Sequence, residues 1–207
     1  SHLNGGDVLR GMFALDATDL RGREVHLARD ECVRQTDIET LAKLPSLTPH
    51  GLVTAGNASE ISDAAAAVIL ADRSEAERAG CSFRYAIAGY GVCGVDPLVM
   101  GRGPVPSIQQ ALGKARIAQE DVGLWEINEA FAAQYLGVEK ELGLDRERVN
   151  VNGGAVAIGH PLAATGVRMT VDLIHEMQRR DARYGCASAC IGGGQGVALV
   201  IRDLEKT

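Results

Sequence analysis

Two glycine-rich turns in the C-terminal part of the chain contain the side chains best suited to chemistry. Asn152–Pro161 carries His160, and Cys190–Gly196 carries Cys190. An unperturbed histidine has the side-chain pKa nearest neutrality, and a thiol can also exchange a proton once its pKa is shifted. Glycine tolerates positive φ and lets backbone N–H groups approach a ligand closely. The two turns together indicate a site for thiol and acyl chemistry.

Each of these residues also has a structural interpretation. A residue before proline is biased away from helix, so His160 is expected to project from a stiff turn, where a histidine can simply be hydrogen-bonded within the loop. Cys190 can be a small buried apolar residue, which is the role expected for Cys186. The glycine-rich turns favour the functional interpretation of both residues over the structural one. Cys190 is the one cysteine followed by a glycine run whose N–H groups can face a developing oxyanion.

Two further polar residues have the same two interpretations. Asn128 opens an expected helix, where it either caps the N-terminus or fixes a water or a carbonyl with its amide. Ser59 is either a helix cap for the alanine run that follows or part of the site. The sequence offers no Gly-x-Gly-x-x-Gly or Walker pattern that we would defend as a phosphate-binding site.

Composition narrows the class of protein. The chain has 207 residues, 46% of them hydrophobic, with a net charge of -6, so a globular core is expected and nucleic acid is not the expected partner. No apolar run approaches the length of a membrane span, and the first residues have no signal-peptide pattern. The five cysteines include no Cys-x-x-Cys pair. We therefore expect reduced thiols, a cytoplasmic location, and neither disulfides nor a metal site.

Helix-like and strand-like segments alternate along the chain. Asp63–Leu70 is apolar nearly all round, which indicates a buried helix or a helix that runs into a central strand. Ser74 is the expected N-cap of a helix over Ser74–Ala79, with Glu77 closing a capping box, and Ser107 is the expected N-cap of a later helix. The other expected elements are a short helix within residues 1–13, a hairpin over 14–30, helices over Thr36–Leu44, Pro106–Ala115, Asn128–Leu142 and Thr165–Arg179, and strands over Phe83–Gly94, Val122–Ile127, Val149–Asn152, Tyr184–Ile191 and Val197–Ile201. This alternation predicts an α/β domain with helices packed on a mixed sheet.

Four blocks of sequence occur in the order in which they are found in thiolases, the acetyl-CoA acetyltransferase and 3-ketoacyl-CoA thiolase enzymes. The chain thus resembles that family over residues 54–194, with weaker matches at Asp30-Glu31-x-x-Arg34 and Gly11-x-Phe13. The blocks are Thr54–Ser59, Asn128–Ala132, Asn150–Ala155 with Gly159–Pro161, and Cys190–Gly194.

The resemblance implies the C-terminal half of a layered α/β/α/β/α fold in which two similar halves pack together. In this half a mixed sheet carries helices on both faces. Residues 1–48 are then the remnant of a loop domain and its connecting segment, and residues 49–207 are the C-terminal thiolase domain. The boundary near residue 48 is where polar, loop-like sequence gives way to the α/β pattern.

The resemblance also implies a role for each candidate residue. Thiolases move acyl groups between coenzyme A and a carbon nucleophile through an acyl-cysteine, which splits one difficult step into two. His160 resembles the base that activates the nucleophilic cysteine, and Cys190 the acid/base at the α-carbon of the acyl-CoA. Asn128 resembles the residue that orients an oxyanion-hole water, and the Gly192 N–H a donor of the other oxyanion hole. The residues that resemble contacts to the CoA thioester are Ser59, Ala130 and Phe131.

One part of the family pattern lies outside this sequence. The acylated cysteine of thiolases belongs to the N-terminal half, and Cys32, Cys81 and Cys93 match other parts of the pattern. We therefore expect a thiolase component whose partner is a complementary N-terminal half, with acyl-CoA and CoA as substrates and no permanently bound cofactor. A homo-oligomer of the complete unit is implied by analogy. The alternative is a non-catalytic thiolase-like module that binds CoA ligands or serves in assembly.

Overall fold

A four-stranded mixed sheet forms the centre of the molecule. The computed structural model describes residues 14–206, so the helix expected within residues 1–13 and the Gly11-x-Phe13 match lie outside the described residues. The strand order is β3 (Tyr85–Gly94), β6 (Gln195–Asp203), β5 (Tyr184–Ile191) and β4 (Val122–Ile127). Strand β6 pairs antiparallel with both β3 and β5, whereas β4 and β5 are parallel.

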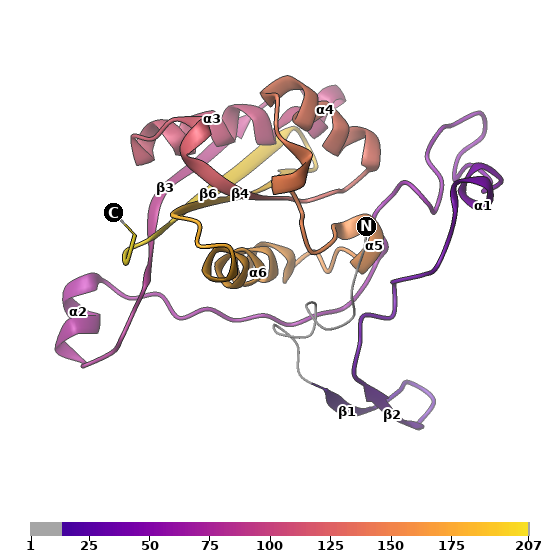
Figure 1. Cartoon of the computed structure of the whole chain (residues 1–207). Coiled ribbons are helices and arrows are strands. Elements are labelled where there is room, and N and C mark those ends of the chain that lie inside the picture. Colours follow the sequence, from indigo (N-terminus) through magenta and orange to yellow (C-terminus); the bar gives the residue numbers. More distant parts are fainter. Residues whose placement is uncertain (1–13, 207) are drawn as a thin grey trace.

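Helices cover both faces of this sheet (Figure 1). Helices α3 (Pro104–Ala115) and α4 (Ala132–Leu142) lie on one face, and α6 (Thr165–Arg179) lies on the other. Ile108, Val138 and Val200 are buried in the first interface, and Met169, Leu173 and Ile201 in the second. The expected α/β fold, with a mixed sheet and helices on both faces, is confirmed.

Short elements connect these layers. Before α3 lies the 3-10 segment η2 (Pro97–Arg102), and before β4 lies η3 (Gln119–Asp121). Between β4 and α6 the chain forms η4 (Arg146–Arg148) and the single turn α5 (Ala155–Ile158). The strand expected over Val149–Asn152 is wrong as a full strand, because only a bridge between Trp125 and Val149 forms there.

Several element boundaries differ from the expectation for local reasons. Asp72, not Ser74, caps α2 (Arg73–Arg78), because its carboxylate accepts the Ser74 N–H at 2.8 Å. Helix α3 begins before Ser107, whose hydroxyl donates back to the Gly103 and Pro104 carbonyls. Helix α4 begins after Asn128, so N-capping is the wrong interpretation of that residue.

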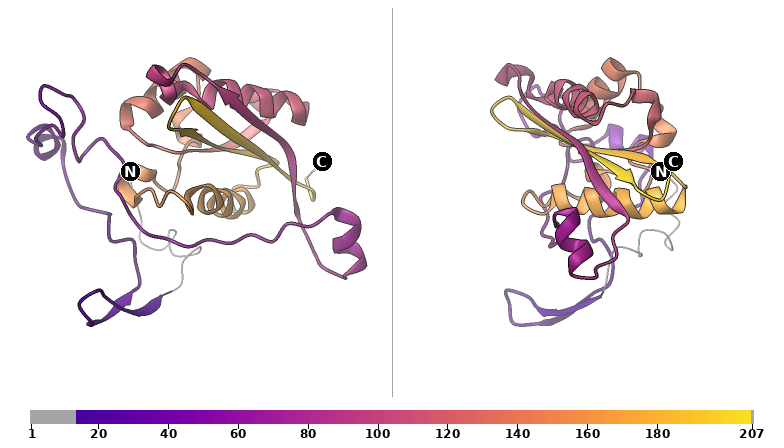
Figure 2. Two further views of the ribbon diagram at one scale, coloured as in Figure 1. Left: turned by 180° about the vertical axis from the view of Figure 1, so that it is seen from behind. Right: turned by 90° about the vertical axis from the view of Figure 1, so that its left-hand side faces the viewer.

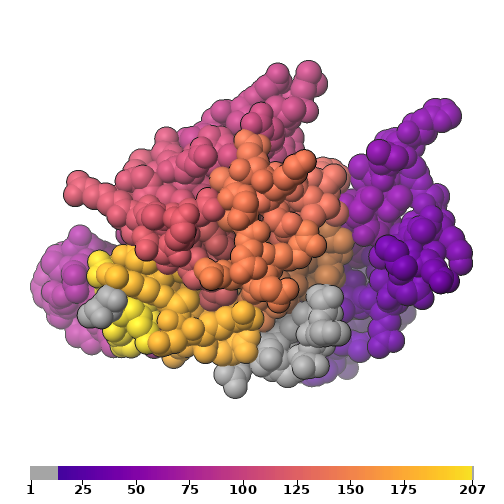
Figure 3. All heavy atoms as spheres, turned by 45° about the horizontal axis from the view of Figure 1, so that its top comes forward, coloured from indigo at the N-terminus to yellow at the C-terminus, as the bar shows by residue number. Residues whose placement is uncertain are grey.

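Residues 14–62 follow an extended path along the molecule. They form the hairpin of β1 (Leu15–Thr18) and β2 (Glu24–Leu27) and the helix α1 (Ile38–Ala42), all as expected. Neither α1 nor α2 contains a buried residue. Figures 2 and 3 show this indigo part at one side of the body that the sheet and its helices form.

The segment Asp63–Leu70 is not a buried helix. It has no regular secondary structure and its residues are exposed, with Ile69 98% and Leu70 71% accessible. In Figures 1 and 2 this stretch leads into α2 and passes α6 on the side away from the sheet. A short run of apolar residues can form either a strand that is buried on both faces or a buried helix. The hydrophobic periodicity of such a run does not distinguish the two structures. Among the described residues nothing packs over these side chains.

We predict that Ile108→Ala lowers the free energy of unfolding by about 2–5 kcal/mol. Ile108 is completely buried between α3 and the sheet, and truncation leaves a cavity. Urea unfolding followed by circular dichroism measures the change. The matched control is Leu98→Ala, at a side chain that is 93% exposed, for which we expect a change within about 0.5 kcal/mol. Equal losses in the two variants would contradict this description of the core.

Candidate active site

The parallel pairing of β4 and β5 places two candidate residues at one edge of the sheet. Asn128 follows β4 directly, and its N–H donates to the Ser188 carbonyl of β5 at 2.9 Å. Cys190 lies on β5 just beyond Ser188. Because the carboxyl ends of parallel strands meet at the same edge, Asn128 and Cys190 are neighbours there. Both residues are buried.

The first glycine turn is anchored to this edge by side chains. The Asn150 side chain accepts the Ile127 N–H at 2.8 Å and donates to the Ile127 carbonyl at 2.9 Å. Asn150 also donates to Glu129, whose other carboxylate oxygen accepts the Val156 N–H of α5 at 3.1 Å. These contacts tie the turn that precedes His160 to the residues that follow β4.

The ring of His160 is held at both nitrogens. Nδ1 lies 2.7 Å from Thr165 Oγ1, and Nε2 lies 3.3 Å from Asn128 Nδ2. The His160 N–H donates to the Glu60 carbonyl at 2.9 Å. Burial, and secondarily the positive charge of Arg168, lowers the pKa of His160 below its ordinary value, so the ring is neutral at physiological pH. A neutral imidazole is the form that can accept a proton.

Gly159 is required immediately before this histidine. Its φ is +90°, a conformation that side chains rarely adopt. A Cβ there would also lie 2.4 Å from Ser62 Oγ, so the segment after Ser59 packs directly on the turn. The glycine therefore allows the chain to pass close to the candidate site.

Ser59, Ala130 and Phe131 lie side by side. The Ser59 N–H donates to the Ala130 carbonyl at 3.0 Å, and Ala58 and Phe131 form an isolated antiparallel bridge. Ser59 does not begin a helix, so its interpretation as a cap is wrong. Phe131 is 39% exposed. The structure brings these three predicted residues together, and their contact with a CoA thioester stays a prediction.

The second glycine turn joins β5 to β6. Burial raises the pKa of the Cys190 thiol, and Gly192 lies in the exposed part of the turn. Gly194 has a φ of +89°, and its carbonyl accepts the Val95 N–H at 2.7 Å. Cys186 is completely buried and its pKa is raised to about 12, as expected of a core residue. Within residues 14–206, no hydrogen bond joins Cys190 to His160 or Asn128.

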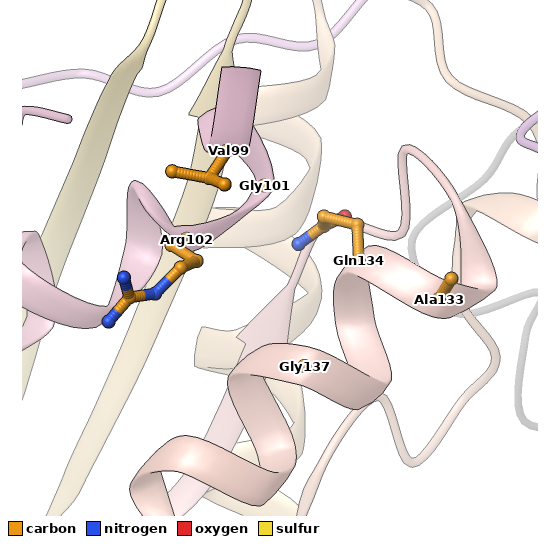
Figure 4. Close-up of a pocket in the computed structure, with 6 residues that line it drawn as sticks. All are labelled: Val99, Gly101, Arg102, Ala133, Gln134 and Gly137. Carbon is orange, nitrogen blue, oxygen red and sulfur yellow. The ribbon is translucent and has the colours of Figure 1, made fainter. Parts of the chain in front are cut away.

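A shallow pocket lies elsewhere, between η2 and α4 (Figure 4). Its lining includes Arg102 and Gln134 and contains none of the predicted site residues. In the described part of the chain, no group of three or more metal-ligating side chains is present. No described helix has the length and apolar character needed to cross a membrane.

Sequence reasoning missed three residues that support the site, namely Thr165, Glu129 and Asn150. Glu129 and Asn150 belong to the blocks Asn128–Ala132 and Asn150–Ala155, but nothing in the sequence pattern shows that they bond each other. Thr165 looked only like the first residue of a helix. Its place soon after a histidine at a helix start is the one signal that could have drawn attention to it.

Two family models match the chain. One, described as the C-terminal domain of thiolase, matches residues 82–203, and the other, described as the N-terminal domain of thiolase, matches residues 13–74. Residues 75–81 lie between the two matches and belong to neither. The predicted boundary near residue 48 stays a prediction.

Curated relatives are similar over almost the whole chain. Mitochondrial 3-ketoacyl-CoA thiolase of Bos taurus is 47% identical over 193 residues, which are 93% of this chain and 49% of the relative. Acetyl-CoA acetyltransferase of Pseudomonas aeruginosa is 48% identical over 201 residues, which are 96% of this chain and 51% of the relative. The chain spans about half the length of the curated relatives that it matches.

Solved structures show the same similarity. The Bacillus anthracis acetyl-CoA acetyltransferase superposes with a TM-score of 0.90 at 48% identity, over 97% of this chain and 51% of that one. Human mitochondrial 3-ketoacyl-CoA thiolase in complex with CoA superposes with a TM-score of 0.79 at 44% identity, over 86% of this chain and 46% of that one.

The burial of the thiols predicts an order of alkylation. Exposed Cys81 should react with iodoacetamide first, Cys190 more slowly and Cys186 last, because the reactive species is an accessible thiolate. Raising the pH should accelerate the reaction of Cys190, whose raised pKa delays ionisation. Fragment-ion mass spectrometry at several time points measures each rate. Equal rates for Cys81 and Cys186 would show that the described burial is wrong.

Proposed function

This chain belongs to the thiolase family, and we propose that it forms the C-terminal component of an acyl-CoA:acetyl-CoA C-acyltransferase. The reaction makes or cleaves a 3-ketoacyl-CoA through an acyl-cysteine. In this proposal the acylated cysteine is carried by a complementary N-terminal half, and this chain adds the part of the N-terminal domain that matches residues 13–74.

The observation that carries the proposal is the contact between His160 and Asn128 at the edge of the sheet where Cys190 lies. A neutral histidine beside this edge can take the proton of a thiol brought against it. The resulting thiolate attacks the C3 carbonyl of the 3-ketoacyl-CoA. The C2–C3 bond then breaks, and its electron pair moves onto the α-carbon of the departing acetyl-CoA.

Cys190 serves as the acid in this step. Burial raises the pKa of its thiol and keeps it protonated at neutral pH, so it can donate to the α-carbon. When CoA–SH then attacks the acyl-cysteine, the Cys190 thiolate takes the proton of the attacking thiol. The bond between the acyl carbon and the cysteine sulfur breaks, and protonated His160 returns its proton to that sulfur. Condensation reverses these steps, with the Cys190 thiolate removing the α-proton of acetyl-CoA.

Oxyanions form in both halves of the reaction and need preorganised donors. The proposal assigns one donor to a water oriented by Asn128, whose buried Oδ1 has no hydrogen-bond partner among the described residues. It assigns another to the N–H of Gly192 in the exposed glycine turn. Ser59, Ala130 and Phe131 contact the CoA thioester, an assignment supported by their adjacency beside the site and by the CoA complex of the human relative.

Association with the complementary half is proposed to use Asp63–Leu70. This extended segment is apolar and exposed, and it belongs to the stretch that the N-terminal domain model matches. It passes α6 on the side away from the sheet, where a second sheet would complete the layers (Figure 1). The segment would then be a strand buried on both faces within that sheet. The complete unit is proposed to be a cytoplasmic homo-oligomer.

We predict that Cys190→Ala abolishes cleavage and condensation but permits acylation of the partner cysteine. Loss of an acid/base group costs about 10²–10⁴-fold in rate where an α-proton moves. Acylation by acetyl-CoA moves no α-proton, and its leaving group is a thiolate, whose conjugate acid has a pKa of about 8.5, so that it can depart without a proton from Cys190. The test co-purifies the chain with an N-terminal thiolase half and measures acetoacetyl-CoA cleavage and the mass of the partner after exposure to acetyl-CoA.

The matched control for this test is Cys81→Ala, at an exposed cysteine remote from the glycine turns. It should retain both activities. Loss of acylation in Cys190→Ala would refute the acid/base role. An assembled pair that is never acylated would instead favour the non-catalytic module.

We predict that Ile69→Asp weakens association with the complementary half at least about tenfold, because a charge would be buried in the completed sheet. Analytical ultracentrifugation of the mixed chains measures the dissociation constant. Leu136→Asp, on the outer helix α4, introduces the same charge at a partly exposed leucine and should leave association unchanged. Unaltered binding by Ile69→Asp would place the interface elsewhere.

A further inference from the structure

Thr165 contacts the imidazole of His160 on the side opposite Asn128. Thr165 is the first residue of α6 and is only 2% exposed. Its Oγ1 lies 2.7 Å from His160 Nδ1 and 3.0 Å from the Pro161 carbonyl oxygen. These two contacts determine how the protons can be arranged around the ring.

The hydroxyl of Thr165 carries one proton and the neutral imidazole carries one. The Pro161 carbonyl only accepts, so the hydroxyl proton is donated to it, as threonines near helix starts commonly do toward a carbonyl four residues back. Oγ1 then has only lone pairs to offer His160. Nδ1 must therefore carry the ring proton and donate it to Oγ1.

The other side of the ring agrees with this arrangement. Nε2 faces the amide nitrogen of Asn128, which donates to a lone pair. The Asn128 oxygen has no hydrogen-bond partner in the described structure. Rotating the amide by half a turn would put the NH₂ group at that position instead. Two unpaired N–H groups there would cost more than one unpaired oxygen.

We propose that Thr165 is a positioning residue that holds neutral His160 as its Nδ1–H tautomer, so that Nε2 is the nitrogen that accepts the proton of the nucleophilic thiol. The catalytic part of this statement rests on the proposed function, whereas the tautomer does not. When Nε2 takes up a proton, Nδ1–H keeps its bond to Oγ1 and the threonine does not reorient. The bond to Thr165 is therefore already in place for the charged ring, whereas the 3.3 Å contact from the Asn128 amide nitrogen gives way when Nε2 takes the proton.

The tautomer can be measured on this chain without a partner or substrate. Imidazole-¹⁵N-labelled protein is recorded at a pH well above 6.5, where the ring is neutral. The signals of His160 are identified by their loss in His160→Gln. We expect a protonated-type Nδ1 and an unprotonated-type Nε2 in the wild type and in Thr165→Ser. In Thr165→Val the two nitrogens should lose this distinction.

Thr170→Val is the matched control on the same helix. The Thr170 hydroxyl donates to the Gly166 carbonyl at 2.8 Å, so this variant removes a comparable helical bond with no contact to His160. It should leave the His160 signals unchanged. An Nε2–H form in the wild type, or identical signals in Thr165→Val and the wild type, would overturn the proposal. The wild-type spectrum decides even where the valine variant does not fold.

A second measurement tests the catalytic consequence. In the assembled pair, Thr165→Val should slow acylation of the partner cysteine at least about tenfold, because the charged ring then lacks an acceptor for its Nδ1–H and part of the neutral ring carries its proton on Nε2. Thr165→Ser should restore the rate to within about threefold. Equal rates for valine and wild type would overturn the positioning role. Absence of acylation in the wild-type pair would refute the proposed function and leave the tautomer result standing.

Discussion

The parallel register between β4 and β5 is the constraint on which the site depends. Ile127 lies opposite Ser188, and the next N–H along β4, that of Asn128, still bonds to the Ser188 carbonyl. A slip of one residue would turn every side chain of one strand to the other face. Asn128 and Cys190 would then no longer meet at one edge. The buried apolar side chains on both faces of these strands fix the register.

The side-chain amide of Asn150 pairs with the outer strand β4 at a position where no backbone strand does so. The Asn150 side chain bonds both the N–H and the C=O of Ile127, the two groups that a neighbouring strand would have paired. This explains why the expected strand over Val149–Asn152 is reduced to one bridge. Because Asn150 also bonds Glu129, side-chain hydrogen bonds join the loop after β4 to the glycine turn before His160. Polar networks with satisfied partners give rigidity to a structure.

The elements with strong periodic patterns could be predicted from sequence. Helix Thr165–Arg179 has the expected bounds, because it buries one face whose helical spacing is visible in the sequence. Strand Val122–Ile127 also has the expected bounds and is buried on both faces. Asp63–Leu70 could not be assigned correctly, since its apolar side chains lack a packing partner in the described residues and no local rule distinguishes a doubly buried strand from a helix.

The site divides in a similar way between what sequence reveals and what it does not. His160 and Cys190 were recognisable because glycine turns and block order mark them. The residues that orient them were not recognisable, because a hydroxyl or an amide that bonds across loops produces no periodic pattern in the sequence. Asn128 was expected to begin a helix, but pairing of the following residues with Asn57 and Ser59 keeps that stretch extended. Tertiary hydrogen bonds here outweigh local helical preference.

The extended apolar segment also bears on the solubility of the chain. From Ala64 to Ala71 it contains no proline and no charge, and such a stretch with free backbone groups is a template for pairing with copies of itself. Asp63, Asp72 and Arg73 flank it and act as charged gatekeepers against that self-association. We therefore expect these three charges to oppose self-association of the chain at high concentration until a partner covers the segment.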